Sequence, residues 1–388
     1  MNRSGQVGLG LIGAAGKFGQ CMLTALDDVP RARLVALADV NSAGLAQARE
    51  LLGVERTYAD ASALIADPDV DAVIVATPPF TQAAIARLVI EGGKGLFLEK
   101  PGAVELADLR AVVDLQRSRR VAATIDYVMR FNPLLDVVRD IRRASWLGAL
   151  RSAQLVNYAQ DETLPPQHWF WNRERSGGIW VEHSVHFFDL YGDLAGAPPI
   201  HVVATGTMRD EAASAGRIDQ VAGMVVHENG VLCSYFHAFN RPRPMEFQQA
   251  LLAFDHGTIT VHGWIGATVK VEAWVNDVVA EALEALPYVS VRQRQNFDRE
   301  LLGRDSTWQA DIHLVLECQL PYNRQENYRL SVAAGLNDLI DSMADRQHQQ
   351  RVTLIDALRS LAVACVAAGT ATMAECREIY QAYQPDGR

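Results

Sequence analysis

The chain opens with an apolar strand, a glycine-rich turn and a second apolar strand that ends in an acidic residue. Val7 to Ile12 predicts the first strand, and Leu34 to Ala38 predicts the second. The turn between them runs from Gly13 to Gly19 and leads into a segment, Cys21 to Leu26, that is typical of a helix. This order of elements favours a parallel sheet with a crossover helix.

The turn and the acid that follows the second strand together predict a dinucleotide site. The pyrophosphate would lie at the helix N-terminus, against the turn residues Gly13, Ala15, Gly16, Lys17 and Phe18. A second register, with Gly8, Gly10 and Gly13 as G-x-G-x-x-G, would place the turn inside the strand. Glycines alone are also compatible with an ordinary tight turn, so the prediction depends on the acid as well.

Asp39 is the acid, and its position also bears on the choice of cofactor. A carboxylate at the end of the second strand binds the ribose 2′ and 3′ hydroxyls and repels a 2′-phosphate. Residues 40–43 contain no lysine or arginine that would neutralise such a phosphate, although Arg56 could fold into reach. The sequence therefore predicts NAD as the cofactor, with NADP less favoured.

Helices and strands continue to alternate up to about residue 126, and antiparallel strands are expected after it. We expect an α/β chain with a doubly wound parallel Rossmann sheet in residues 1–126 and an α+β domain with a large, mostly antiparallel sheet in residues 127–388. The further elements expected in the first part are helices at 43–52, 81–91 and 104–116, and strands at 72–76, 95–98 and 121–125. Those expected in the second part are strands at 150–158, 201–208, 220–227, 231–239, 247–254, 258–262 and 269–274, and helices at 133–143, 182–194 and 354–368.

The ligand crevice of such a parallel sheet lies beyond the carboxyl ends of its strands. Thr77 and Pro78 follow one strand, and Glu99 and Lys100 follow the next, so we expect all four near the cofactor. Pro101 restricts Lys100 to an extended backbone, which gives its side chain a fixed origin. A lysine there can take part in catalysis.

A second group of candidate residues lies between Gly177 and Asp189. In a helix that begins near Glu182, the side chains of Glu182, His186 and Asp189 would share a face, and His186 could carry a proton. The ordinary alternatives are a solvated helix face or a structural core histidine. Because His183 and His186 do not have the H-E-x-x-H spacing, no metal site is expected.

Aromatic and polar residues near this run are candidates for binding a carbohydrate, since flat rings stack on sugar C–H faces. The alternative for each is a place in the core, in an interface or in an ion pair. The candidate substrate-binding residues are Arg130, Tyr158, Trp169, Trp171, Arg173 and His183.

Over essentially its whole length the sequence resembles the glucose-fructose oxidoreductase, inositol dehydrogenase and rhizopine catabolism family. The resemblance is carried by the glycine turn, Glu99-Lys100-Pro101, Arg130-Phe131-Asn132-Pro133 and the run from Gly177 to Asp189. It implies that Lys100, Glu182 and His186 are the catalytic groups. Three features depart from the family pattern: Glu182 replaces the usual Asp, Ser184 stands at a position usually held by a small residue, and the turn has one extra residue.

Composition limits the partners. The net charge of −10 provides no basic field for nucleic acid or an anionic membrane. Five scattered cysteines and the absence of a long apolar run or leader-like N-terminus predict a soluble, cytoplasmic protein without a disulfide framework. An antiparallel sheet with only two expected covering helices predicts a homodimer or a homotetramer.

The resulting hypothesis is an NAD-dependent dehydrogenase of a sugar, sugar derivative or polyol. His186 would take the hydroxyl proton while Lys100 polarises the oxygen and Glu182 aligns the imidazole, although Lys100 and His186 could exchange roles. Two alternatives stay open. One is a redox-neutral enzyme that recycles NAD through a transient keto-sugar, for elimination, epimerisation or glycoside cleavage, and the other is a non-catalytic NAD- or sugar-binding regulator.

Overall fold

The computed structural model describes residues 5–16, 19, 24–208, 217–303 and 307–384. Within them the chain divides into two compact units. The first contains the described residues of 1–131, 167–189 and 328–388, and the second contains those of 132–166 and 190–327. The first unit is therefore built from three separate stretches of sequence, the last of which is the helical C-terminal segment.

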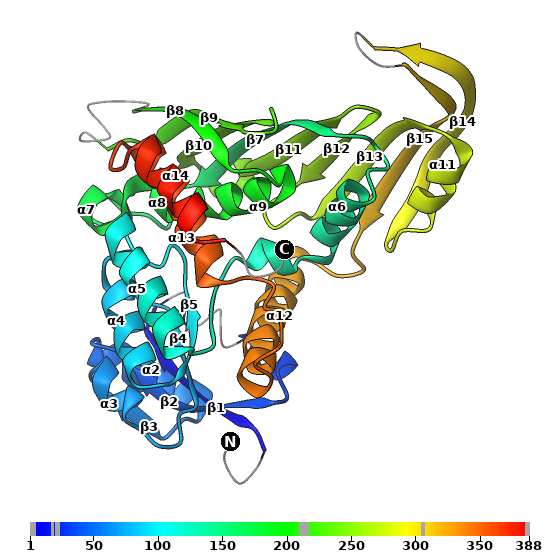
Figure 1. The fold of residues 1–388 in the computed structure, drawn as a ribbon. Coiled ribbons are helices and arrows are strands. Elements are labelled where there is room, and N and C mark those ends of the chain that lie inside the picture. Colours follow the sequence, from blue (N-terminus) through cyan, green and yellow to red (C-terminus); the bar gives the residue numbers. More distant parts are fainter. Residues whose placement is uncertain (1–4, 17–18, 20–23, 209–216, 304–306, 385–388) are drawn as a thin grey trace. The chain divides into compact units, whose positions relative to one another are not determined.

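The first unit contains a six-stranded parallel sheet with the strand order β3-β2-β1-β4-β5-β6 (Figure 1). This order confirms the predicted Rossmann sheet. Apolar residues without alternation form its central strands, since helices cover both faces. The strands are β1 (Val7–Ile12), β2 (Ala32–Ala38), β3 (Arg56–Tyr58), β4 (Ala72–Val75), β5 (Gly95–Leu98) and β6 (Ala123–Ile125).

Helices from both ends of the chain cover this sheet. Gly335 in the C-terminal helix α12 lies against Phe97 of β5, whereas Leu98 contacts the turn before α5 at Gly102. The helices of this unit are α2 (Ser42–Leu52), α3 (Ala61–Ile65), α4 (Pro79–Glu91), α5 (Leu106–Arg119), α7 (Arg173–Ser176), α8 (Gly178–Glu182), α12 (Arg324–Ala344, except its first turn), α13 (Leu354–Ala368) and α14 (Met373–Ala382). The helix expected at 21–26 lies largely outside the described residues, and Leu26–Asp28 forms a short 3-10 helix, η1.

The second unit is built on a nine-stranded sheet with the order β14-β15-β13-β12-β11-β7-β10-β9-β8, in which only the pair β7 and β10 is parallel. The predicted mostly antiparallel sheet is thus confirmed. Its strands are β7 (Leu150–Gln160), β8 (Pro199–Thr207), β9 (Gln220–His227), β10 (Leu232–Arg241), β11 (Phe247–Phe254), β12 (Gly257–His262), β13 (Thr268–Val275), β14 (Val289–Leu302) and β15 (Thr307–Gln319). Helices α6 (Pro133–Arg143) and α11 (Asp277–Glu284) belong to the same unit.

The two faces of this sheet differ in burial. Side chains such as those of Cys233, Tyr235 and His237 in β10 are buried on one face. The opposite face, which we call the outer face, carries exposed apolar side chains on neighbouring strands: Val156, Val203, Met224, Leu232 and Phe247. A cluster of exposed apolar residues of this kind is typical of a surface that another protein covers.

Candidate functional site

The glycine turn after β1 lies directly against the end of β4. Gly13 has a φ of +91°, a conformation that favours glycine, and a Cβ atom there would lie only 2.5 Å from the carbonyl oxygen of Ala76. The backbone N–H of Gly16 donates to the carbonyl oxygen of Gly13 at 3.1 Å, which closes the turn. Between Gly13 and Gly16 the turn carries only glycine and alanine, which leaves room for a phosphate group to approach the backbone, as a dinucleotide requires. Lys17 and Phe18 lie outside the described residues.

Asp39 stands at the end of β2 and faces the same turn. Its Oδ2 accepts a hydrogen bond from the N–H of Ala15 at 2.9 Å, and its Oδ1 accepts one from the N–H of Asn41 at 2.8 Å. Arg56, the cation that could have bound a 2′-phosphate, instead forms ion pairs with Asp67 at 2.9 Å and Asp69 at 2.5 Å. The geometry of the turn and of Asp39 therefore fits NAD.

A buried glutamine that the sequence had not indicated joins the next two loops. Gln82 of α4 donates to the carbonyl oxygens of Thr77, at 2.9 Å, and Lys100, at 3.0 Å, while its Oε1 accepts from the N–H of Gly102 at 2.8 Å. Pro78 precedes the first residue of α4. Gln82 thus fixes the predicted crevice residues Thr77 and Lys100 relative to each other.

The structure brings Lys100, Glu182 and His186 together in the first unit. The Nζ of Lys100 donates to the Oε1 of Glu182 at 2.5 Å and to its carbonyl oxygen at 2.8 Å. All three residues are buried. Glu182, which we expected to align the imidazole of His186, forms an ion pair with Lys100.

The imidazole of His186 is buried. Its burial, and secondarily the charge of Lys100, holds its pKa well below the ordinary value, so the ring carries no charge near neutral pH. The ring packs edge-on against Tyr127, with centroids 5.8 Å apart, and lies 6.4 Å from the ring of His183. The hydroxyl of Tyr127 shares a hydrogen bond with the Oγ of Ser360 in α13, which fixes the tyrosine ring.

The expected continuous helix from Glu182 to Leu194 is wrong, because the chain breaks between two helices. Helix α8 ends at Glu182, and α9 runs from Val185 to Ala195. The N–H groups of His183 and Ser184 both donate to the carbonyl oxygen of Ile179, and the Ser184 hydroxyl donates to it as well. As a result the carbonyl of Glu182 accepts from Lys100, a contact that a continuous helix would have prevented.

Two further carboxyl groups lie beside Lys100, one of them expected and the other not. The Oε2 of Glu99 accepts from the backbone N–H of Lys100 at 3.0 Å, and Asp126, at the end of β6, lies next to Glu99 at the end of β5. Each is only 4% exposed. Burial is the main cause that raises both pKa values, that of Asp126 to about 7.

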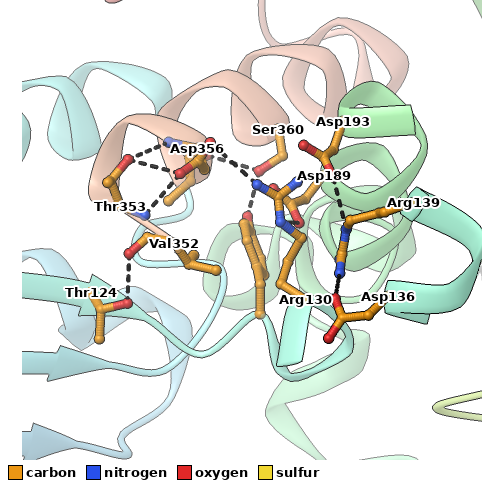
Figure 2. A network of polar contacts seen from close by, with 12 residues as sticks. Thr124, Arg130, Asp136, Arg139, Asp189, Asp193, Val352, Thr353, Asp356 and Ser360 are labelled. Carbon is orange, nitrogen blue, oxygen red and sulfur yellow. Dashed lines mark hydrogen bonds and ion pairs between the residues drawn. The ribbon is translucent and has the colours of Figure 1, made fainter. Parts of the chain in front are cut away.

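Arg130, a predicted substrate contact, is directed toward two carboxylates of the protein. Its Nε lies 3.8 Å from the Oδ2 of Asp189, and its Nη2 lies 3.9 Å from the Oδ1 of Asp356 (Figure 2). Asp356 also closes the capping box of α13 with Thr353. Arg130 is 3% exposed, so these contacts favour a structural role in which it joins α9 to α13.

The remaining predicted substrate contacts differ in their surroundings. Trp169 and Trp171 are half-buried in a 3-10 helix, η3, and His183 is half-buried beside Phe187 at 5.5 Å between ring centroids. Arg173 is exposed and donates to the carbonyl oxygen of Ala368. Tyr158 belongs to the second unit, where the guanidinium of Arg241 lies 3.9 Å from its ring centroid.

His168, at the start of η3, is a further titratable residue in this neighbourhood that our site prediction omitted. Its Nδ1 accepts from the N–H of Phe170 at 3.2 Å. Burial lowers the pKa of His168, and the charge of Glu182 acts in the opposite direction, which indicates that the two side chains are close. The signal in the sequence was its place directly before the two tryptophans.

Two features are absent from the described residues. No group of three or more His, Cys, Asp or Glu side chains in the described part of the chain could hold a metal ion. No helix in the same residues has the length and apolar character needed to span a bilayer.

Family models match most of the chain. Residues 7–127 match the oxidoreductase family model with an NAD-binding Rossmann fold, and residues 136–269 match the GFO/IDH/MocA C-terminal domain.

Two curated relatives and one solved structure illustrate the similarity. An inositol 2-dehydrogenase of Rhizobium meliloti is 29% identical over 58% of this chain and 66% of its own, and a myo-inositol 2-dehydrogenase of Thermotoga maritima is 28% identical over 59% and 66%. The matches thus span slightly less than two thirds of these relatives. A scyllo-inositol dehydrogenase of Lactobacillus casei, solved with NAD(H) and scyllo-inositol, shares the fold with a TM-score of 0.71 at 16% identity, over 94% of this chain and 96% of the other.

Proposed function

This chain belongs to the GFO/IDH/MocA oxidoreductase family, and we propose that it transfers a hydride between a hydroxyl-bearing carbon of a polyol or sugar and NAD. The observation that carries the proposal is the buried contact between Lys100 and Glu182, beside a neutral His186, in the unit that also contains the glycine turn and Asp39. The names of the relatives favour a cyclic polyol such as an inositol as the substrate.

The proposed roles follow from charge and position. His186, neutral and buried, accepts the proton of the substrate hydroxyl at one of its ring nitrogens. Lys100 donates a hydrogen bond to the same oxygen, and Glu182 holds the lysine side chain in place. Bound NAD, when oxidised, supplies the hydride acceptor. The chain thus contributes proton handling and orientation.

The first test is a substrate panel. Purified protein with NAD is mixed with inositols, aldoses and other polyols, and the absorbance of reduced nicotinamide is followed. Reduction with a cyclic polyol would support the proposal. Binding of NAD without reduction by any compound would favour the regulator, and product formation without accumulation of NADH would favour the redox-neutral enzyme.

We predict that NAD binds more tightly than NADP. Asp39 is held by two backbone N–H groups where it can accept bonds from the ribose hydroxyls, and Arg56 is engaged by Asp67 and Asp69. Asp39→Ala should narrow the difference in binding free energy between NAD and NADP by about 1–2 kcal/mol. The substitution removes both the hydrogen bonds to the ribose hydroxyls and the repulsion of the 2′-phosphate. Calorimetric titration with both cofactors measures this. Tighter binding of NADP to the unmodified protein would contradict the assignment.

We also predict that the protein is a dimer, or a tetramer built from dimers. The exposed apolar side chains of the outer face, among them Phe247 at 47%, need a partner surface, and a second copy provides one by symmetry. Light scattering at micromolar concentration determines the mass. A monomer mass near 42.6 kDa would contradict this prediction, and Met224→Lys with Phe247→Lys should shift an oligomer toward that mass.

Residues 127–388 are proposed to serve substrate binding and assembly, and the cytoplasm is proposed as the location. Cys233, Cys318, Cys365 and Cys376 are free and buried, which suits a reducing compartment.

A further inference from the structure

Glu99 and Asp126 form a pair of acids at the carboxyl ends of two neighbouring strands. Strands β5 and β6 pair in parallel, with Leu98 opposite Ile125, so the residues that follow each strand lie side by side. The N–H of Asp126 donates to the carbonyl oxygen of Leu98 at 2.8 Å, which fixes this arrangement. The side chains of Glu99 and Asp126 therefore start from neighbouring positions, and each residue is only 4% exposed.

Two buried acids at adjacent positions favour a proton on one of them, because two ionised carboxylates repel each other and neither has a donor to offer the other. The charges around the pair support the same conclusion. Among the described residues, Lys100 is the ammonium that acts on Glu99 and Asp126, and Glu182, which also acts on Glu99, already forms an ion pair with that lysine. His186, the next titratable group beside Lys100, is neutral. Two further ionised carboxylates would leave a buried excess of negative charge, which is unfavourable.

We propose that Glu99 and Asp126 share one proton beside Lys100 and release it when an oxidised dinucleotide brings its positive ring charge into the crevice. In this step one carboxyl O–H bond breaks, and the proton leaves to water. When the ring becomes neutral on reduction, one carboxylate takes up a proton again. Glu99 and Asp126 are positioning residues in this scheme, since they set the charge next to Lys100. The inference rests on the proposed use of NAD.

The consequence is a proton-linked preference between the two forms of the cofactor. Because binding of the oxidised form releases a proton, its affinity should increase with pH while that of the reduced form changes less. The ratio of the dissociation constants for NADH and NAD⁺ should therefore increase with pH, by at most about tenfold per pH unit. Titrations with both forms of the cofactor are made at several pH values on either side of 7, the approximate folded pKa of Asp126.

The decisive variant is Glu99→Gln combined with Asp126→Asn, which keeps the shape of the pair but removes its exchangeable proton. In this double variant the ratio should lose most of its dependence on pH. Each single variant keeps one carboxyl group that still titrates. The pH dependence of its ratio should therefore lie between that of the wild type and that of the double variant. Asp67→Asn is the matched control, because Asp67 is also a buried carboxyl of the first unit but is bonded to Arg56 and Tyr58. In the Asp67→Asn variant the ratio should depend on pH as it does in the wild type.

A measurement without cofactor separates this inference from the proposed function. Because both acids have raised pKa values, the folded protein holds a proton that the unfolded chain loses at about pH 4. The stabilising contribution of Asp126 is therefore lost as pH rises toward about 7, its folded pKa. The Tm of the wild type should fall relative to that of the double variant over this range.

The outcomes are distinguishable. The difference in Tm between the wild type and the double variant could depend on pH while the ratio of dissociation constants for NADH and NAD⁺ does not. That result overturns proton release on binding. A Tm difference that does not change with pH overturns the shared proton itself. If neither form of the cofactor binds, the proposed function and the release step both fail, and the Tm measurement still decides whether the pair shares a proton.

Discussion

Replacing Lys100 by Met, or His186 by Ala, is expected to reduce turnover by roughly a hundredfold or more while NAD affinity stays nearly unchanged. In the proposed mechanism, each substitution removes a group that handles the substrate hydroxyl and leaves the glycine turn and Asp39 intact. Steady-state kinetics with an identified substrate measure the first effect, and calorimetry with NAD measures the second.

Lys94→Met is the control for the lysine variant. Lys94 donates to the carbonyl oxygens of Val70, at 2.6 Å, and Asp67, away from the catalytic groups, so its loss should leave turnover close to normal. The double variant of Lys100 and His186 should lose far less than the product of the two single losses, since both groups act on one proton transfer. Near-normal turnover of either single variant, with chemistry rate-limiting, would exclude that residue from the mechanism.

The loss of Arg130 is expected to affect stability rather than substrate affinity. Arg130→Met leaves Asp189 and Asp356 without this buried cation, and breaking a buried pair in this way costs about 3 kcal/mol or more in the free energy of unfolding. Urea unfolding measures the change. Arg351→Met is the control. Because Arg351 is half-buried and lies over the ring of Phe131, its replacement should lower the free energy of unfolding by much less.

The same variant decides between the two interpretations of Arg130. If Arg130→Met unfolds at the wild-type urea concentration but raises KM strongly, the arginine binds substrate, as the sequence had suggested. A loss of stability with KM unchanged in the folded fraction supports the structural role that its contacts with α9 and α13 indicate.

The Rossmann sheet could be predicted because its signals are local. Strand β5 is a continuous apolar run that ends at Glu99, and Leu354–Ala368 is a helix of small and apolar residues with a Thr353 cap, so both could be located from the sequence. In contrast, the long hairpin of β14 and β15 was not expected. Residues 289–302 are almost all exposed and rich in charged and polar side chains, and they lack the alternation that marks a half-buried strand.

The parts of the site that the sequence did not predict depend on contacts between distant segments. The partner of Glu182 is Lys100, 82 positions away, because the break after α8 turns the Glu182 carbonyl toward the lysine. Asp126 became a candidate only when the pairing of β5 with β6 placed it beside Glu99. No spacing rule along the chain contains this information, since it arises from tertiary packing.

The central claim is that Lys100 and His186 support hydride transfer from a hydroxyl-bearing carbon to NAD, and a single-turnover experiment tests it most directly. Enzyme in excess, loaded with NAD, is mixed rapidly with each inositol and sugar, and the absorbance of reduced nicotinamide is followed. This design also detects an enzyme that recycles its cofactor, because the reduced form then appears transiently. We predict that at least one cyclic polyol produces this signal and that Lys100→Met and His186→Ala suppress it. An NAD-saturated wild-type protein that gives no signal with any compound, or variants that give the wild-type signal, would contradict the account.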